Sequence, residues 1–163
     1  MWGVKPPMNL LSNLLSLPNV ALDVEVHDKR EALILAAHVF EDNHGLSAER
    51  VFDCLMAREQ LCSTGLGKGV AIPHGRLRGL KQAAAAILRV KDPIEFGSPD
   101  GQPVRLLVVL LVPDQATQQH LEILSELAQM LSEPSMREQL ETIMQPAALL
   151  ATVAAWEPIR PAA

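Results

Sequence analysis

The segment VRLLVVLLVP, Val104 to Pro113, is the most apolar run in the chain. Every residue from Leu106 to Val112 is Leu or Val, so both faces of a strand formed here would be apolar. Such a strand must be covered on both faces, and helices supply that cover in α/β proteins. The run is also far too short to cross a bilayer. It therefore predicts a central strand between two layers of helices.

Two segments upstream are predicted to join this strand in a sheet. VALDVEV, residues 20–26, alternates apolar and polar residues as a half-buried strand does. AAAAILRV, residues 83–90, is apolar enough for a buried strand, although its alanines leave a helix possible. The following PIEFGSPDGQP contains Pro and Gly at intervals and indicates turns around a short extended piece.

Helix signals occur on both sides of the predicted strands. MNLLSNLL, residues 8–15, predicts a short N-terminal helix. Asp28 followed three residues later by Glu31 forms a capping box, which begins a helix that should end near Gly45. Ser47 is placed to cap the next helix, AERVFDCLMAREQ.

Helical spacing returns after the central strand. QQHLEILSELAQMLSE has its leucines on one face, and Pro134 and Pro146 suit the first turns of two more helices. Helices on both faces require crossover connections and hence some parallel pairing of strands. The pattern predicts a single domain over residues 1–163.

Composition excludes several classes of function. The formal net charge of -5 gives the chain no general attraction for nucleic acid, and we expect no membrane insertion and no nucleic-acid partner. The N-terminus lacks the pattern of a secretory signal. The two cysteines, Cys54 and Cys62, are therefore expected as reduced thiols in a cytoplasmic protein.

The stretch STGLGKGVAIPHGR, residues 63–76, is the most unusual in the chain, with four glycines before or beside one histidine. Pro73 restricts the backbone just before His74. Backbone N–H groups of a glycine-rich loop can face one centre and bind an anion, and Ser63 and Thr64 add hydroxyl donors. A flexible surface loop with an incidental histidine explains the same residues, and the spacing alone does not decide between the two interpretations.

A second histidine and an arginine favour the anion-binding interpretation. His120 follows the central strand and would lie in the first turn of a helix if Thr117 is its N-cap. Arg58 ends the helix before the glycine-rich stretch and could hold phosphate oxygens in a bidentate grip. A nucleophilic imidazole beside these groups predicts reversible phosphorylation of His74, with no metal and no cofactor required.

Other site types fit the sequence poorly. The stretch lacks the Lys-Ser/Thr ending of a Walker phosphate loop and the glycine spacing of a dinucleotide-binding fingerprint. His74, His120, Cys54 and Cys62 match no compact zinc-binding spacing.

Three separated blocks resemble one known family, in the same order along the chain. AREQLCSTGLGKGVAIPHGRL, PIEFGSPDGQPVRLLVVLLVP and HLEILSELAQML are similar to the IIA type-2 domains of the bacterial phosphoenolpyruvate-dependent phosphotransferase system. These are the mannitol/fructose-type IIA domains and the nitrogen-regulatory IIA protein. The resemblance covers roughly residues 8–150, and the C-terminal helix and tail, 146–163, match the family poorly.

The resemblance implies a fold and a set of roles. The fold would be a three-layer α/β/α sandwich on a mixed sheet of four to five strands. His74 would accept the phosphoryl group through Nε2, with His120 assisting and Arg58 near the site. Ser63, Thr64, Gly65 and Gly67 would bind phosphate. Lys68 departs from the family, in which a neutral residue, often Asn, is expected.

The resemblance also implies partners. The donor would be an HPr-like phosphocarrier charged by Enzyme I from phosphoenolpyruvate, and the output would go to regulatory protein targets or to a IIB domain. A chain with no fused IIB, IIC or HPr-like segment favours the nitrogen-regulatory role. The alternatives are the IIA subunit of a fructose/mannitol-type sugar transporter and a binding module without phosphotransfer activity. The presence of His74, His120 and Arg58 argues against the inactive module.

Overall fold

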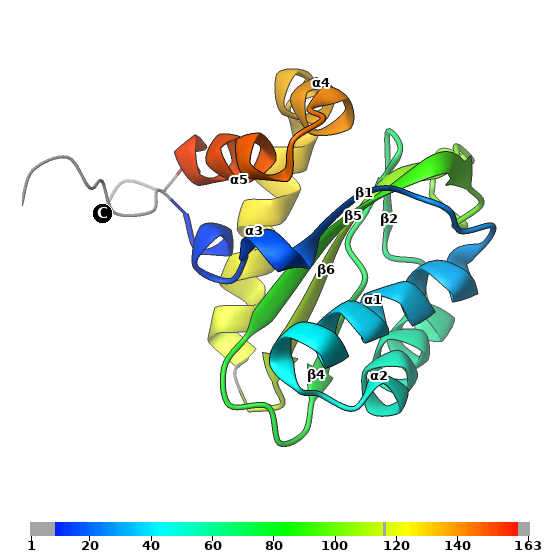
Figure 1. Ribbon diagram of the computed structural model, residues 1–163, viewed down its shortest axis with the longest axis vertical. Coiled ribbons are helices and arrows are strands. Elements are labelled where there is room, and N and C mark those ends of the chain that lie inside the picture. The colour runs from blue at the N-terminus through cyan, green and yellow to red at the C-terminus, as the bar shows by residue number, and fades with distance from the viewer. Residues whose placement is uncertain (1–8, 116, 160–163) are drawn as a thin grey trace, which may run out of the picture.

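A mixed β-sheet lies between two layers of helices (Figure 1). The computed structural model describes residues 9–115 and 117–159. Its elements are the short 3-10 helices η1 (Leu11–Asn13) and η2 (Leu17–Asn19), the helices α1 (Lys29–His44), α2 (Ala48–Leu61), α3 (Thr117–Ser132), α4 (Pro134–Thr142) and α5 (Pro146–Ala155), and the strands β1 (Val20–Val24), β2 (Gly65–Gly67), β3 (Val70–Ala71), β4 (His74–Leu77), β5 (Ala84–Ile94) and β6 (Val104–Pro113).

The predicted central strand is confirmed, since β6 has neighbours on both sides. The sheet order is β1-β5-β6-β3-β2, and β4 also pairs with β6. The β5–β6 pair is antiparallel, whereas β1–β5, β3–β6 and β4–β6 are parallel. The described sheet has six strands instead of the four to five expected. The glycine-rich stretch accounts for the difference, because it forms the short strands β2, β3 and β4.

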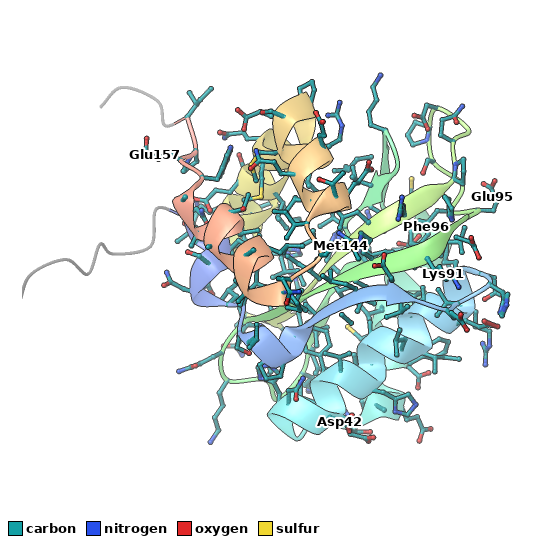
Figure 2. All side chains as sticks on the ribbon, turned by 45° about the horizontal axis from the view of Figure 1, so that its top comes forward. Asp42, Lys91, Glu95, Phe96, Met144 and Glu157 are labelled. Carbon is teal, nitrogen blue, oxygen red and sulfur yellow. The ribbon has the colours of Figure 1, made fainter. Side chains whose placement is uncertain are left out.

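The two faces of the sheet build two apolar cores. Because side chains alternate along a strand, Leu107, Val109 and Leu111 of β6 face one way and Leu106, Val108 and Leu110 the other. The first set packs with α1 and α2, and the second with η1, α3, α4 and α5. Figure 2 shows side chains filling the space between the sheet and both helical layers. The expected three-layer sandwich is therefore confirmed.

The predicted ends of α1 are confirmed, with one change in the capping box. The Asp28 carboxylate accepts a hydrogen bond from the Glu31 backbone N–H at 2.8 Å. The Glu31 carboxylate accepts from the N–H of His27, at 2.9 Å, rather than from that of Asp28. Gly45 ends the helix in the left-handed conformation, at φ 68°.

The N-terminal part differs from the prediction. Residues 9–15 contain only the 3-10 helix η1 instead of a helix over 8–15, and Met8 lies outside the described residues. The first strand ends at Val24, two residues early. Asp23 has a φ of 55°, which breaks the strand register and turns its carboxylate toward Arg89 of β5, whose Nε donates at 3.0 Å.

The C-terminal helix is part of the second core. Leu149 and Val153 of α5 are fully buried. Asn9 Nδ2 donates to the carbonyl oxygens of Val153 and Trp156, each at 2.8 Å, which ties the start of the described chain to the end of α5. The helices predicted to begin at Pro134 and Pro146 are both confirmed. Within residues 9–115 and 117–159, no helix combines the length and apolar character needed to cross a bilayer.

Candidate functional site

His74 is the first residue of β4 and lies opposite Leu110 of the central strand. Its Nδ1 lies 2.7 Å from the carbonyl oxygen of Ile72. A carbonyl oxygen only accepts hydrogen bonds, so Nδ1 carries the proton in the neutral ring and Nε2 keeps its lone pair. Ile72, which comes just before Pro73, supplies this carbonyl two residues before the ring that it orients. The imidazole is thus held with Nε2 as the available nucleophile.

Gly75 allows β4 to lie close against α2. A Cβ atom at this position would lie 2.5 Å from Sγ of Cys54. The Cys54 thiol donates to the carbonyl oxygen of Arg76 at 3.2 Å, and burial raises its pKa. Cys54 therefore helps to hold the strand that carries His74, and it remains a thiol.

His120 lies beside His74. The two ring centroids are 5.3 Å apart and the ring planes meet at 67°. The helix α3 begins at Thr117 itself, so Thr117 is its first residue and not its N-cap, while His120 still lies at the end of the first turn. Arg76 Nε donates to Nδ1 of His120 at 3.4 Å, which puts the His120 proton on Nε2. Within the described residues this buried Nε2 has no hydrogen-bond partner.

The surroundings of both imidazoles favour the neutral form. Burial lowers the pKa of His74 below its ordinary value of 6.5, and the charge of Arg58 lowers it further. Burial likewise lowers the pKa of His120. Electrostatic interactions with His74, Arg76 and Arg58 lower it further. A neutral His74 can act as a nucleophile, and a neutral His120 can donate its Nε2–H.

Arg58 shares a cavity with His74. The cavity has a volume of about 260 Å³, and its lining includes Arg58, Ser63, Thr64, Gly65, His74 and Leu124. The Arg58 guanidinium is anchored at one end, because Nη1 donates to the carbonyl oxygen of Cys62 at 2.7 Å. A fixed guanidinium beside an imidazole provides positive charge and directed donors for phosphoryl oxygens.

The predicted phosphate donors of the loop are engaged within the protein. The Ser63 hydroxyl donates to the carbonyl oxygen of Phe96 at 2.7 Å and accepts from the N–H of Gly65 at 3.0 Å. The N–H and the hydroxyl of Thr64 both donate to the Glu59 carboxylate. These residues line the cavity, but their hydrogen bonds hold the loop in shape instead of leaving an open nest of donors.

Gly67 and Lys68 lie away from this cavity. They line a different one, of about 520 Å³, with residues of α3 and α4. The N–H of Lys68 donates to the Asp100 carboxylate at 2.8 Å, and its φ is 59°. The left-handed backbone explains why Asn, which tolerates it, is expected here. The structure therefore does not bring Gly67 together with the other proposed phosphate ligands.

Two site residues were missed by the sequence analysis. Arg76 follows His74 by two residues in a strand, a spacing that places both side chains on one face and could have revealed it. Glu59 lies eight residues after Val51 and four after Leu55, on the buried face of α2. A carboxylate at that helical spacing was the available signal.

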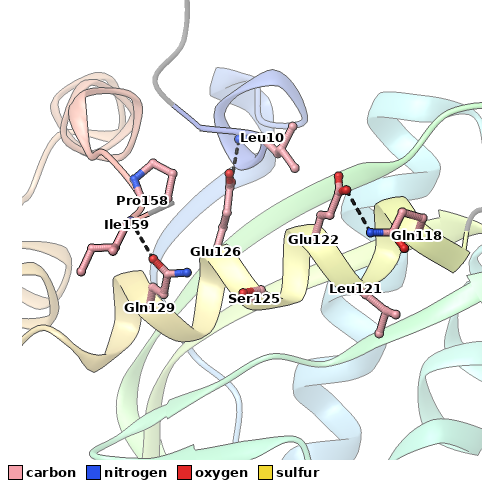
Figure 3. Close-up of a pocket in the computed structure, with 9 residues that line it drawn as sticks. All are labelled: Leu10, Gln118, Leu121, Glu122, Ser125, Glu126, Gln129, Pro158 and Ile159. Atoms are coloured by element: carbon pink, nitrogen blue, oxygen red, sulfur yellow. Dashed lines mark hydrogen bonds between the residues drawn. The ribbon is translucent and has the colours of Figure 1, made fainter. Parts of the chain in front are cut away.

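Other parts of the described structure contain fewer side chains that could bind a metal or take part in a reaction. Within the described ranges, no group of three His, Cys, Asp or Glu side chains could hold a metal ion. A cavity of about 490 Å³ runs along α3 between Leu10 and Ile159 (Figure 3). Its carboxylates, Glu122 and Glu126, accept hydrogen bonds from Gln118 and from the N–H of Leu10, and no histidine lines it.

Comparison with known proteins identifies the family. Residues 13–156 match the family described as "Phosphoenolpyruvate-dependent sugar phosphotransferase system, EIIA 2". The chain is 47% identical over 95 residues to a nitrogen regulatory protein of Pseudomonas aeruginosa, a match that covers 58% of this chain and 62% of that protein. The match thus spans less than two thirds of that relative's length. A nitrogen regulatory protein of Klebsiella oxytoca is 37% identical over 131 residues, which are 80% of this chain and 81% of the relative.

Two solved structures and a further sequence relative extend the comparison. The nitrogen regulatory protein IIA-Ntr from Neisseria meningitidis superposes with a TM-score of 0.84 at 46% identity, over 87% of this chain and 97% of that one. The mannitol IIA of Escherichia coli shares the fold, with a TM-score of 0.72 at 21% identity, over 86% of this chain and 99% of that one. A fructose-specific EIIABC component of Bacillus subtilis is 30% identical over 131 residues, which are 80% of this chain and 21% of that protein.

Proposed function

The chain belongs to the EIIA 2 family of the phosphoenolpyruvate-dependent sugar phosphotransferase system, and we propose that it is a phosphocarrier of the nitrogen-regulatory type that takes up a phosphoryl group on His74. The observation that carries the proposal is the hydrogen bond from His74 Nδ1 to the Ile72 carbonyl oxygen, which leaves Nε2 as the nucleophile. The proposed donor is an HPr-like protein, phosphorylated on a histidine of its own.

The transfer step needs only a nitrogen nucleophile and a nitrogen leaving group. The lone pair of His74 Nε2 forms the new bond to phosphorus. The bond between phosphorus and the donor's imidazole nitrogen breaks, and that nitrogen leaves with the electron pair. No proton has to leave His74, because its proton stays on Nδ1 in the hydrogen bond to Ile72. The product is a phosphohistidine whose ring keeps its orientation.

His120 and Arg58 have complementary roles in this proposal. The Nε2–H of His120, which has no partner among the described residues, would donate to a phosphoryl oxygen on His74. Arg58, which lines the same cavity as His74, would supply positive charge. Donors fixed before the reaction stabilise developing charge at little cost in reorganisation. Ser63, Thr64 and Gly65 would hold the loop that frames the phosphoryl group, and the role of Gly67 in phosphate binding stays a prediction.

Similarity to nitrogen regulatory proteins supports the regulatory branch. Two relatives and the Neisseria meningitidis structure carry that name. The output would be a regulatory protein that distinguishes the phosphorylated from the unphosphorylated state, in the cytoplasm. The alternative is a IIA subunit that passes the phosphoryl group to the IIB component of a fructose/mannitol-type sugar transporter. The similarity to the fructose-specific component supports that alternative at lower identity.

Phosphorylation by a reconstituted donor chain tests the function. The chain is incubated with phosphoenolpyruvate, Enzyme I and an HPr-like carrier, and ³¹P NMR then reports whether the phosphohistidine is formed at Nε2 or at Nδ1. We expect an Nε2 signal that disappears in His74→Gln. His38→Gln is the matched control, because His38 is exposed on α1, and it should be labelled like the parent.

The variant His120→Gln tests whether His120 assists phosphoryl transfer to His74 without accepting the phosphoryl group itself. This variant should fold and still accept phosphate on His74, but more slowly, by about tenfold or more. A label on His120 in the parent, or full labelling of His74→Gln, would contradict the assignment. Phosphoryl transfer from the labelled chain to a IIB protein, at a rate similar to uptake, would favour the transport alternative.

A further inference from the structure

We propose that Glu59 is a positioning residue for His74, acting through the backbone of Thr64 and Ile72, with Lys29 as its counter-ion. The inference rests on the proposed phosphoryl acceptance at His74 for its kinetic test, but its structural test is independent of that function. Glu59 touches no reacting atom, so its role is to place the imidazole and to fix which ring nitrogen carries the proton.

The Glu59 carboxylate is deeply buried at the end of α2. Its side chain is 1% exposed and accepts a hydrogen bond from Lys29 Nζ of α1 at 2.9 Å. A buried carboxylate is costly unless it is paired and hydrogen-bonded. Lys29, in turn, lies over the ring of Phe96, 4.5 Å from its centroid. The carboxylate is therefore held between two helices before it contacts the loop.

Thr64 connects this carboxylate to the glycine-rich stretch. The N–H of Thr64 donates to both carboxylate oxygens, at 3.3 and 3.2 Å, and its hydroxyl donates to Oε1. The carbonyl oxygen of the same residue accepts from the N–H of Ile72 at 3.0 Å. Thr64 thus links Glu59, across the loop, to the segment just before His74.

Ile72 completes the connection to the imidazole. Its carbonyl oxygen accepts the Nδ1–H of His74 at 2.7 Å. The sequence of hydrogen bonds therefore runs from His74 to Ile72, from Ile72 to Thr64, and from Thr64 to Glu59. At Ile72 and at Thr64, the residue's N–H donates on the side of the carboxylate and its C=O accepts on the side of His74.

The fixed geometry of these bonds has a chemical consequence. The N–H and C=O of one residue belong to successive peptide groups joined through Cα, so the series transmits position. Because the charged carboxylate anchors Thr64 and Thr64 anchors Ile72, the Ile72 carbonyl oxygen is kept where it accepts from Nδ1. This bond at Nδ1 favours the tautomer with a lone pair on Nε2. Outer groups that orient a working histidine act in this way in other proteins.

A purely structural role for Glu59 would predict something different. A carboxylate that only stabilises the loop would change the unfolding free energy when removed, without changing the ring tautomer of the folded molecule. The tautomer of His74 is thus the decisive observable. It can be read from the ¹⁵N chemical shifts of the two ring nitrogens in the full unphosphorylated chain at a pH where the ring is neutral.

Glu59→Gln is the main test, because it keeps the shape of the side chain and removes its charge. We expect the Nδ1–H tautomer of His74 to lose population and phosphoryl acceptance to slow by about tenfold. Glu49→Gln, on the exposed face of the same helix, is the matched control and should match the parent in both measurements. A folded Glu59→Gln chain with the parent's tautomer would overturn the proposal, even if its acceptance were slower.

Two further variants keep the proposal testable if Glu59→Gln does not fold. Thr64→Val retains the backbone N–H and removes only the hydroxyl, so it should shift the tautomer in the same direction by a smaller amount. Lys29→Arg preserves the counter-ion and should keep the parent's tautomer, whereas Lys29→Met should not. Unchanged tautomers in both Thr64→Val and Lys29→Met would refute the role of Glu59. If the parent took up no phosphoryl group, the proposed function would fail, and the tautomer measurements would still decide the positioning role.

Discussion

His74 and His120 lie side by side and carry their protons on opposite ring nitrogens. The Ile72 carbonyl holds the proton of His74 on Nδ1, and the guanidinium of Arg76 leaves that of His120 on Nε2. One ring thus presents a lone pair and the other an N–H. In the proposed transfer, the same residue type would serve as nucleophile and as donor because each ring has a different partner at Nδ1.

The two site histidines should titrate at lower pH than an exposed histidine of the same chain. Burial lowers the pKa of both His74 and His120 below 6.5, whereas the Glu31 carboxylate raises the pKa of exposed His27 above 6.5. The resonances of the ring Cε1–H protons, followed by NMR against pH, should therefore give midpoints on opposite sides of 6.5. Midpoints for His74 and His120 at or above that of His27 would contradict this assignment.

The same shifts affect stability in a defined pH window. In the unfolded chain these histidines gain protons near pH 6.5, while in the folded chain they stay neutral to lower pH. The unfolded state therefore binds more protons in that window, and the stability contributed by the neutral rings is lost as the pH falls from about 6.5 through their folded pKa values. Replacing His74 by Gln should reduce this loss in urea titrations.

Arg58→Lys should slow phosphoryl acceptance while leaving the fold unchanged. Lysine keeps the charge but lacks the planar fork that can both donate to the Cys62 carbonyl and reach phosphoryl oxygens. We expect a decrease of about tenfold or more in the rate of transfer from the carrier, measured by rapid quench. Arg30→Lys, on α1, is a suitable control. Equal rates for Arg58→Lys and the parent would remove Arg58 from the mechanism.

At the scale of elements, the contact between β4 and α2 positions His74, the proposed nucleophile. His74 begins β4, and Gly75 brings this strand against Cys54 of α2. Arg58 and Glu59 lie at the end of the same helix. One helix therefore holds the strand, supplies the guanidinium and anchors the loop, so a small shift between β4 and α2 would change the position of His74 relative to Arg58.

Gly75→Ala should separate the strand from the helix. The added methyl would lie 2.5 Å from Cys54 Sγ, well inside normal contact, so we expect a loss of about 1–3 kcal/mol in the unfolding free energy and slower phosphoryl acceptance. Urea denaturation measures the first effect. Adding Cys54→Ala removes the clashing sulfur and should recover part of both losses in a double-mutant cycle. Strictly additive effects of the two substitutions would show that the sulfur contact is not the cause.

At the scale of the whole molecule, Arg89 joins the sheet to one helical layer. Its side chain is 1% exposed and donates Nε and Nη2 to the two carboxylate oxygens of Asp23 on β1. Its Nη1 donates to the carbonyl oxygens of Leu140 and Ile143 at the end of α4. The guanidinium thus donates to a neighbouring strand and to a helix terminus from within the buried part of β5, residues 84–90, whose other residues are all apolar.

Arg89→Met should be among the most destabilising single substitutions in the chain. Methionine is apolar and flexible enough to fit, but it leaves the Asp23 carboxylate and two carbonyl groups without their donor. We expect a loss of about 3 kcal/mol in the unfolding free energy, measured by urea denaturation. Arg105→Met is the control, because Arg105 is 41% exposed and its Nη2 is 3.8 Å from Asp23, so its loss should stay below about 1 kcal/mol. Equal losses would contradict the role given to burial.

The sequence by itself determined the elements whose signals are local. The Leu/Val run of β6, the caps at Asp28 and Ser47 and the prolines at 134 and 146 each act within a few residues, and all are borne out. The helical spacing of α3 and the pair Pro73–His74 could be recognised for the same reason, because both are local signals. The three separated blocks then pointed to the family and to His74, His120 and Arg58 as the residues to look for.

Only the tertiary structure decided how those residues are arranged. The Ser63 hydroxyl bonds to Phe96, Thr64 to Glu59, and Arg89 to Asp23, and the partners of Ser63 and Arg89 are more than thirty positions away in the chain. The short strand β4, the bulge at Asp23 and the buried Glu59 likewise depend on neighbours from other elements. A helix cap or a periodic pattern depends on adjacent residues. The partner of a buried donor can be any acceptor that folding brings within about 3 Å. These partners are therefore set only when the sheet and both helical layers have assembled.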